Sequence, residues 1–248
     1  MWIVGVDCAT IDKKVGLALG KYANGTLKIE DATLCSPKTP ATEIIANWLQ
    51  PENRPALLAI DAPLGWPIAL AHALTNHRAG NPIPEEPDDL FHRITDKYIT
   101  ENLRKRPLEI GADRIARTAH AALRMIGEVS QRLSADIPLA WSLKDLAGIK
   151  AIEVYPAATL TAHGLISSGY KKSEQTAHRT KIIAGITGKV DIPKQLMPLL
   201  ESNADILDAA VCLLAAKDFL DGHALAPQPN IRTVAEIEGW IWAAPRQF

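Results

Sequence analysis

The 248-residue chain predicts an α/β fold built on a mixed five-stranded sheet flanked by helices. Three strand-like segments come first, at residues 2–8, 15–20 and 26–34, and Asn24-Gly25 is a strong hairpin signal between the last two. A helical pattern at 41–49 then leads to a short apolar run at 56–60, typical of a buried parallel strand. We therefore expect three antiparallel strands, followed by a fourth that a right-handed crossover makes parallel to the first.

The rest of the chain adds helices and a fifth strand. Residues 66–150 are expected to form a mainly helical insertion, with helices at 94–104 and 115–133. A strand at 151–155 ends at Pro156, and the last strong helix covers 203–219. Because no internal repeat or low-complexity tract divides the chain, residues 1–248 are expected to form a single domain.

Composition narrows the class of protein. Hydrophobic residues make up 47% and charged residues 22%, which argues against disorder. A net charge of -1 argues against a protein that coats nucleic acid non-specifically, although a local basic face remains open. No apolar stretch reaches the roughly 20 residues of a membrane helix. The three cysteines lack metal-finger spacing and lie in or beside apolar runs, so we expect reduced thiols in a cytoplasmic protein.

Two aspartates stand at the ends of predicted neighbouring strands. Asp7 ends the apolar run of the first strand, and Asp61 ends that of the fourth. Either residue alone could simply close its strand with a local turn. Sites in α/β sheets, however, gather at the carboxyl ends of parallel strands, and an unpaired buried carboxylate costs several kcal/mol, roughly. A divalent cation would compensate both, since hard oxygen ligands select Mg²⁺ and Mn²⁺.

A second acidic pair lies in the last helix. Asp205 and Asp208 are three residues apart and share a helix face inside an otherwise apolar segment. Ser202 could cap this helix, which would give Asp205 a capping-box role, but Asp208 stands a turn further on, where no cap explains it. Glu153, between Ile152 and Val154, could be a further acid of the site or could lie on the solvated face of its strand.

These motifs together resemble the ribonuclease H fold. The Asp205-x-x-Asp208 helix is most similar to the Holliday-junction resolvase branch, and the chain more narrowly resembles the predicted ribonuclease-H-like nucleases of the domain of unknown function 429 family. The matching stretches are Gly5-Val6-Asp7, Ile60-Asp61-Ala62-Pro63-Leu64-Gly65, Arg93-Ile94-Thr95-Asp96, Glu153-Val154-Tyr155-Pro156, Tyr170-Lys171, Asp205-Ile206-Leu207-Asp208-Ala209 and Gly239-Trp240-Ile241 with Pro245. They span nearly the whole chain.

The resemblance implies a metal-dependent nuclease. Asp7, Asp61 and Asp208 would be the main ligands of two Mg²⁺ or Mn²⁺ ions, with Asp205 as a further ligand and Glu153 as a further catalytic acid. Two such ions, about 3.5–4 Å apart, can activate a water and stabilise the leaving oxygen during phosphodiester hydrolysis. The partner would be nucleic acid, whose type the sequence does not specify.

Basic residues could contact that substrate. Residues 93–124 hold eight Lys/Arg against four acids, and 171–189 hold five against Glu174 alone. Arg93, Lys171 and Arg179 match family-like positions, although such runs are often solvated surface, and Arg93 could instead bond Asp96.

Two other functions stay open. A phosphotransferase of the actin and sugar-kinase kind shares the topology but needs a Gly-rich phosphate turn, which Asp7-Cys8-Ala9-Thr10 lacks. A non-catalytic binding protein would have no use for buried carboxylates. A helical surface on residues 66–150 could also support a homodimer.

Overall fold

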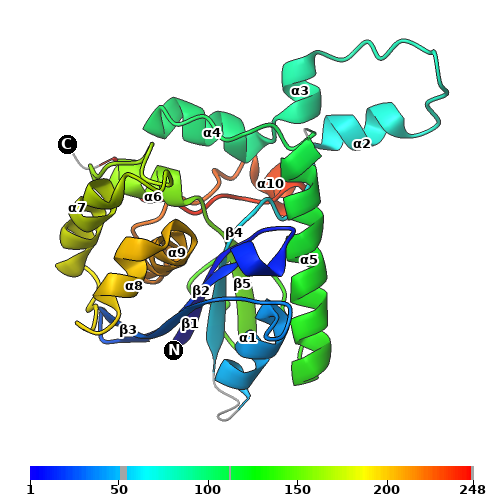
Figure 1. Cartoon of the computed structure of the whole chain (residues 1–248). Helices are drawn as coiled ribbons and strands as arrows, with labels where there is room; N and C mark the ends of the chain where they lie inside the picture. Colours follow the sequence, from blue (N-terminus) through cyan, green and yellow to red (C-terminus); the bar gives the residue numbers. More distant parts are fainter. Residues whose placement is uncertain (51–54, 112, 247–248) are drawn as a thin grey trace.

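The sheet of this protein is mixed and twisted, and helices cover both of its faces (Figure 1). A computed structural model describes residues 1–50, 55–111 and 113–246. Within them, five strands pair in the order β3-β2-β1-β4-β5. Their bounds are β1 (Trp2–Asp7), β2 (Gly16–Ala23), β3 (Thr26–Leu34), β4 (Ala56–Asp61) and β5 (Ile149–Glu153).

Strand directions follow the predicted pattern. β2 runs antiparallel to both β1 and β3, whereas β4 runs parallel to β1 and β5 parallel to β4. The sequence prediction of a ribonuclease H-like mixed sheet is confirmed. β1 lies at its centre, so residues at its carboxyl end have neighbours on both sides.

The β2–β3 hairpin closes through the predicted Asn-Gly turn. Asn24 and Gly25 both have positive φ, 51° and 75°, and Ala23 pairs with Thr26. Two successive left-handed residues form a turn whose twist matches that of the strands, and Asn and Gly adopt this conformation at little cost. The turn therefore fixes the register in which β3 begins to pair with β2.

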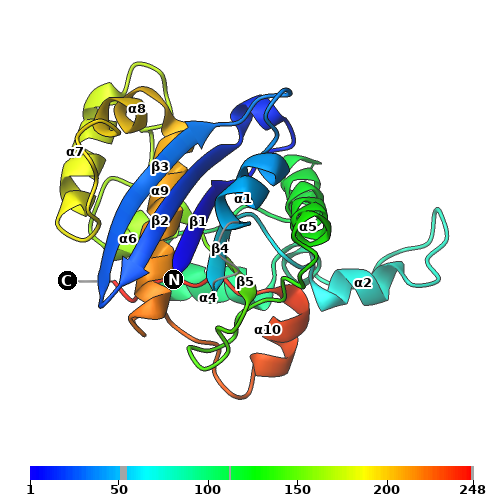
Figure 2. The ribbon, with the colours of Figure 1, turned by 90° about the horizontal axis from the view of Figure 1, so that it is seen from below.

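One face of the sheet is covered mainly by α9 (Ala204–Leu220), and α6 (Pro156–Ala162), α7 (Thr176–Thr187) and α8 (Met197–Ser202) lie on the same side (Figure 2). The opposite face carries α1 (Ala41–Leu49) and α5 (Asp113–Leu133), which contact each other. A single turn, η1 (Asp12–Lys14), links β1 to β2. Two apolar clusters, one on each side of the sheet, form the main core.

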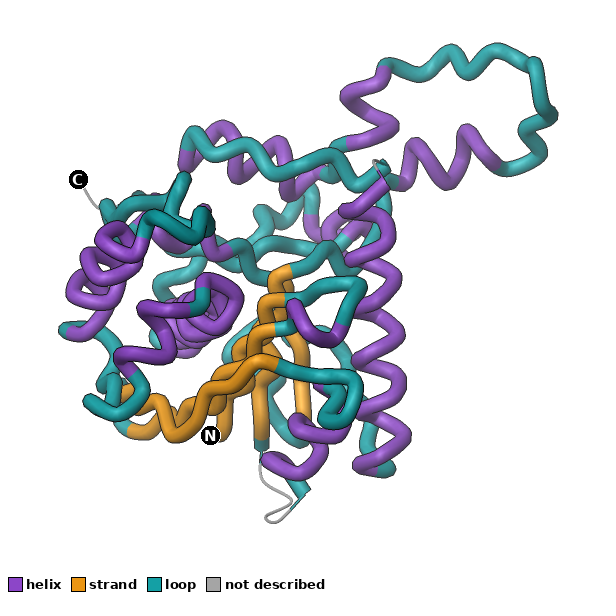
Figure 3. Tube along the Cα trace, in the orientation of Figure 1, coloured by secondary structure: helices purple, strands orange, loops and turns teal. Residues whose placement is uncertain are grey.

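Helices and long loops alternate in the described part of the chain between β4 and β5. It contains α2 (Ile68–Leu74), α3 (Pro87–Phe91), α4 (Ile94–Leu103) and α5, and the loop from α2 to α3 extends away from the body of the protein (Figure 3). After α9, the chain forms α10 (Arg232–Glu238) and then runs beside β5, where Ile241 bridges Glu153. This last segment closes the sheet edge next to the acidic residues described below.

Candidate metal centre

The register of the sheet brings Asp7 and Asp61 side by side. β1 and β4 are parallel neighbours, and their paired residues run from Trp2 with Ala56 to Asp7 with Asp61. Both strands therefore end at the same level, and both aspartates leave the sheet at its carboxyl edge. This is the edge at which sites in α/β sheets form.

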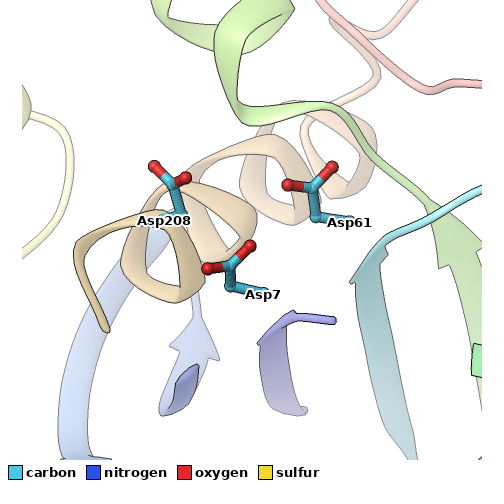
Figure 4. Close-up of side chains that lie close together, drawn as sticks. All are labelled: Asp7, Asp61 and Asp208. Atoms are coloured by element: carbon cyan, nitrogen blue, oxygen red, sulfur yellow. The ribbon is translucent and has the colours of Figure 1, made fainter. Parts of the chain in front are cut away.

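Close packing of α9 on β1 supplies a third carboxylate, that of Asp208. A Cβ at Gly5 would overlap the carbonyl oxygen of Ala209, so only glycine lets the helix backbone lie this near the strand. Asp208 is completely buried, and its carboxylate faces those of Asp7 and Asp61 (Figure 4). Among the described residues these three form a group that could hold a metal ion, with one oxygen of each within 4.8 Å of the others.

The cap of α9 differs from the predicted one. Asn203 is the N-cap, and its side-chain oxygen accepts hydrogen bonds from the backbone N–H groups of Asp205 and Ile206, at 2.9 and 3.1 Å. The Ser202 hydroxyl instead donates to the Leu199 carbonyl, so the capping box predicted with Ser202 is wrong. Asp205 is half-buried in the first turn, outside the group of three carboxylates.

Two side chains from the segment before α7 reach Asp208. The Tyr170 hydroxyl donates to Asp208 Oδ1 at 2.7 Å, and the Lys171 ammonium forms an ion pair with Asp208 Oδ2. Lys171 Nζ also lies 3.9 Å from Asp7 Oδ1. The lysine side chain is 55% exposed, so its charge reaches the buried acids from the solvent side.

The electrostatics of the group favour protons or cations. Burial raises the pKa of Asp7 well above its usual value, and the neighbouring Asp208 charge raises it further. Burial likewise raises the pKa of Asp61 to about 7, although Lys171 partly opposes this effect. The pKa of Asp208 is also raised, mainly by burial. The three carboxyl groups resist being ionised at the same time. A cation bound between them would stabilise their ionised forms.

Glu153 lies apart from this group and makes a different contact. Its carboxylate binds the guanidinium of Arg93, with Nη2–Oε1 at 2.6 Å and Nη1–Oε2 at 2.8 Å, and Oε2 also accepts from the Leu64 N–H at 3.0 Å. Because Leu64 follows Asp61 by three residues, Glu153 holds the segment that follows β4. The structure thus gives Glu153 a positioning role rather than a place among the ligands.

Arg93 is buried rather than available to a substrate. Its Nη2 donates to Asp96 Oδ1 at 2.9 Å, the local bond considered above, and its side chain is 2% exposed. Glu238, which the sequence analysis missed, fastens the same region by accepting from the N–H groups of Ile68 and Ile94. A buried guanidinium with two carboxylate partners has no free face for phosphate, so the predicted substrate contact of Arg93 is replaced by an internal one.

Arg179 is also an internal residue. It is 3% exposed, and its guanidinium donates to backbone carbonyls that include those of Tyr170, Lys172 and Glu201. These bonds order the segment that carries Tyr170 and Lys171. Of the three basic residues predicted to bind substrate, only Lys171 reaches the carboxylates directly.

A comparison with protein families identifies the chain's relatives. One family model, described as a protein of unknown function (DUF429), matches residues 5–232. The chain belongs to the DUF429 family. The match includes all three clustered aspartates and both Tyr170 and Lys171. No curated protein matches the chain.

Two further features of this DUF429 chain are the character of its helices and the state of its cysteines. In the described part of the chain, none of the helices combines the length and apolar character needed to cross a bilayer. Cys8, Cys35 and Cys212 are free thiols, and the last two are buried. Burial, followed by the charges of Asp61 and Asp7, raises the pKa of the Cys8 thiol to about 12, so this neighbour of the metal-site strand is unreactive at neutral pH.

Proposed function

We propose that this DUF429 protein is a metal-dependent nuclease that hydrolyses phosphodiester bonds in nucleic acid. The observation that carries the proposal is the convergence of Asp7, Asp61 and Asp208 from three separate elements to within 4.8 Å. Burying three carboxylates together is unfavourable unless a cation compensates them. Mg²⁺ and Mn²⁺ suit such a set of oxygen ligands.

Each acid has a distinct place in the proposed centre. Asp7 would lie between the other two acids, because β1 pairs with β4 and also contacts α9. Asp61 and Asp208 would complete the set of residues that hold the metal. Bound ions of this kind supply an activated water and stabilise the leaving oxygen in an in-line displacement. Asp205 lies close enough to add to the negative potential at Asp7.

Lys171 and Tyr170 support the acids from the solvent side. The Tyr170 hydroxyl fixes one oxygen of Asp208, and the Lys171 ammonium lies against the other. When cations are bound, the half-exposed lysine is free to turn outward, where it can contact a substrate phosphate. The free cysteines support the prediction of a reducing, cytoplasmic compartment.

The test is a cleavage assay on end-labelled nucleic acids. Wild type, Asp7→Asn and the exposed control Asp136→Asn are incubated with single-stranded, double-stranded and branched DNA and RNA, in Mg²⁺, Mn²⁺ or EDTA. Cleavage by wild type and the control with metal, at least about a thousandfold faster than by Asp7→Asn, is the expected result. Failure to cut any substrate, or metal-independent cutting that Asp7→Asn retains, contradicts the proposal. Transfer of the ATP γ-phosphate would instead favour the phosphotransferase alternative.

A further inference from the structure

A pocket of about 100 Å³ opens directly beside the metal-site acids. Asp61 forms part of its wall, so the pocket and the three carboxylates share a residue. The remaining wall comes mostly from apolar side chains of the loop before α5, of the first turn of α5 and of the segment after β5, among them Pro107, Leu108, Ile115 and Tyr155. The pocket therefore continues the candidate metal centre away from the sheet.

The polar groups at its base are already satisfied. Arg93, Asp96 and Glu153 line the pocket, but they bind one another through the ion pairs described above. One guanidinium faces two carboxylates there, so the base does not attract an anionic group. The half-buried Tyr155, by contrast, gives the wall an apolar ring that carries a polar hydroxyl. An apolar group with a polar edge would match this combination.

Leu108 gives the mouth of the pocket an exposed apolar wall. It is 69% exposed, the most exposed of the large hydrophobic side chains in the described chain. A single exposed leucine is common on protein surfaces. Here it lines a pocket whose wall also includes Asp61, so a group bound at the three carboxylates would lie near it.

We propose that this pocket receives the edge of a nucleobase from the strand whose phosphodiester lies at Asp7, Asp61 and Asp208. The inference rests on the proposed function, because it takes the phosphate to be bound at these acids. An apolar cavity of roughly 150 Å³ can take up benzene, so a pocket of about 100 Å³ that is open to solvent admits part of a six-membered ring. Contact with Leu108 and Tyr155 would hold the base without reading its identity.

The experiment compares bases with bare phosphates. Fluorescence anisotropy measures the binding of a labelled short oligothymidylate and of an abasic strand of equal length. Ca²⁺ replaces Mg²⁺ in the buffer, so that the acids can still coordinate a divalent cation. Wild type is expected to bind the thymidylate about tenfold more tightly, within the usual contribution of base contacts to single-strand binding. Leu108→Asn is expected to reduce this preference at least threefold, whereas Leu143→Asn, a control at another exposed leucine, leaves it unchanged.

The outcomes separate this inference from the proposed function. Equal binding of the two strands by wild type, or an equal loss of preference in Leu108→Asn and Leu143→Asn, overturns the pocket assignment even if the protein cleaves nucleic acid. A base preference that depends on Leu108, without cleavage of any strand, supports the pocket and contradicts the nuclease proposal. Binding of neither strand overturns the pocket assignment, whereas the cleavage assay on double-stranded and branched substrates decides the nuclease proposal separately. Competition by free thymidine monophosphate at the same concentration as the strand would assign the pocket to mononucleotides and contradict the strand assignment.

Discussion

Replacing Asp61 by asparagine should stabilise the metal-free protein at alkaline pH. Burial raises the pKa of this carboxyl from its usual value of 3.8 to about 7. A difference of about three pKa units corresponds to about 4 kcal/mol. Because the folded-state pKa is raised, the protein loses this stability as the pH rises through 7, when Asp61 ionises in place. Asparagine keeps the shape of the side chain but cannot ionise.

The expected gain in the free energy of unfolding is smaller than the value of about 4 kcal/mol that the full pKa shift would give. Asp61 is partly exposed, and its ionised form also interacts favourably with Lys171, which asparagine would forgo. We therefore expect Asp61→Asn to be about 2 kcal/mol more stable than wild type at pH 8 in EDTA, or about 4–8 °C in Tm. At pH 5 Asp61 is protonated in the folded wild type but largely ionised in the unfolded chain, so the difference should fall below about 1 kcal/mol and vanish only below about pH 4.

Urea denaturation and thermal melts measure this directly, with Asp136→Asn as the control at an exposed aspartate. The stabilisation caused by metal binding provides a second test of the same variant. At a Mn²⁺ concentration a hundredfold above Kd, binding should stabilise wild type by about 2.7 kcal/mol, and Asp61→Asn by much less. A variant that is less stable than wild type at pH 8, or that gains as much from Mn²⁺, would refute the reasoning.

Three further changes follow from the same contacts. Arg93→Met leaves two buried carboxylates unpaired, so urea denaturation should show a loss of about 3–5 kcal/mol; a loss below about 1 kcal/mol would contradict the buried network. Gly5→Ala forces α9 away from β1 and should lower both Tm and Mn²⁺ affinity, whereas Gly127→Ala, whose Cβ would meet open space in α5, should raise the free energy of unfolding by about 0.5–1 kcal/mol. Lys171→Met removes a competing cation, so calorimetry should show Mn²⁺ affinity rising about fivefold, corresponding to about 1 kcal/mol for a half-exposed ion pair; an unchanged affinity would exclude that competition.

The strand-end acids could be predicted because local pattern and topology point the same way. Asp7 and Asp61 each follow a short apolar run, and the crossover between those runs makes them parallel neighbours. Asp208 could be separated from Asp205 because it lies beyond the first turn of its helix, where a capping explanation fails. The three clustered acids could therefore be identified in the sequence.

The basic residues were harder to place, because a charge run does not show which members are buried. Arg93 lies in a locally basic stretch, yet one of its carboxylate partners, Glu153, is 60 residues away and comes from another element. Arg179 is buried by backbone carbonyls, which any sequence supplies. The contact of Tyr170 with Asp208 likewise depends on how the chain returns after β5, and periodicity carries no information about that path.

The most direct test of the metal centre is a crystal structure of the protein soaked in Mn²⁺, with anomalous diffraction recorded to locate the ion. The acidic group predicts anomalous peaks bonded to oxygens of Asp7, Asp61 and Asp208, and the Lys171 ammonium displaced from Asp208. Saturating Mn²⁺ with no anomalous peak at these three carboxylates, and with Lys171 still paired to Asp208, would contradict the account.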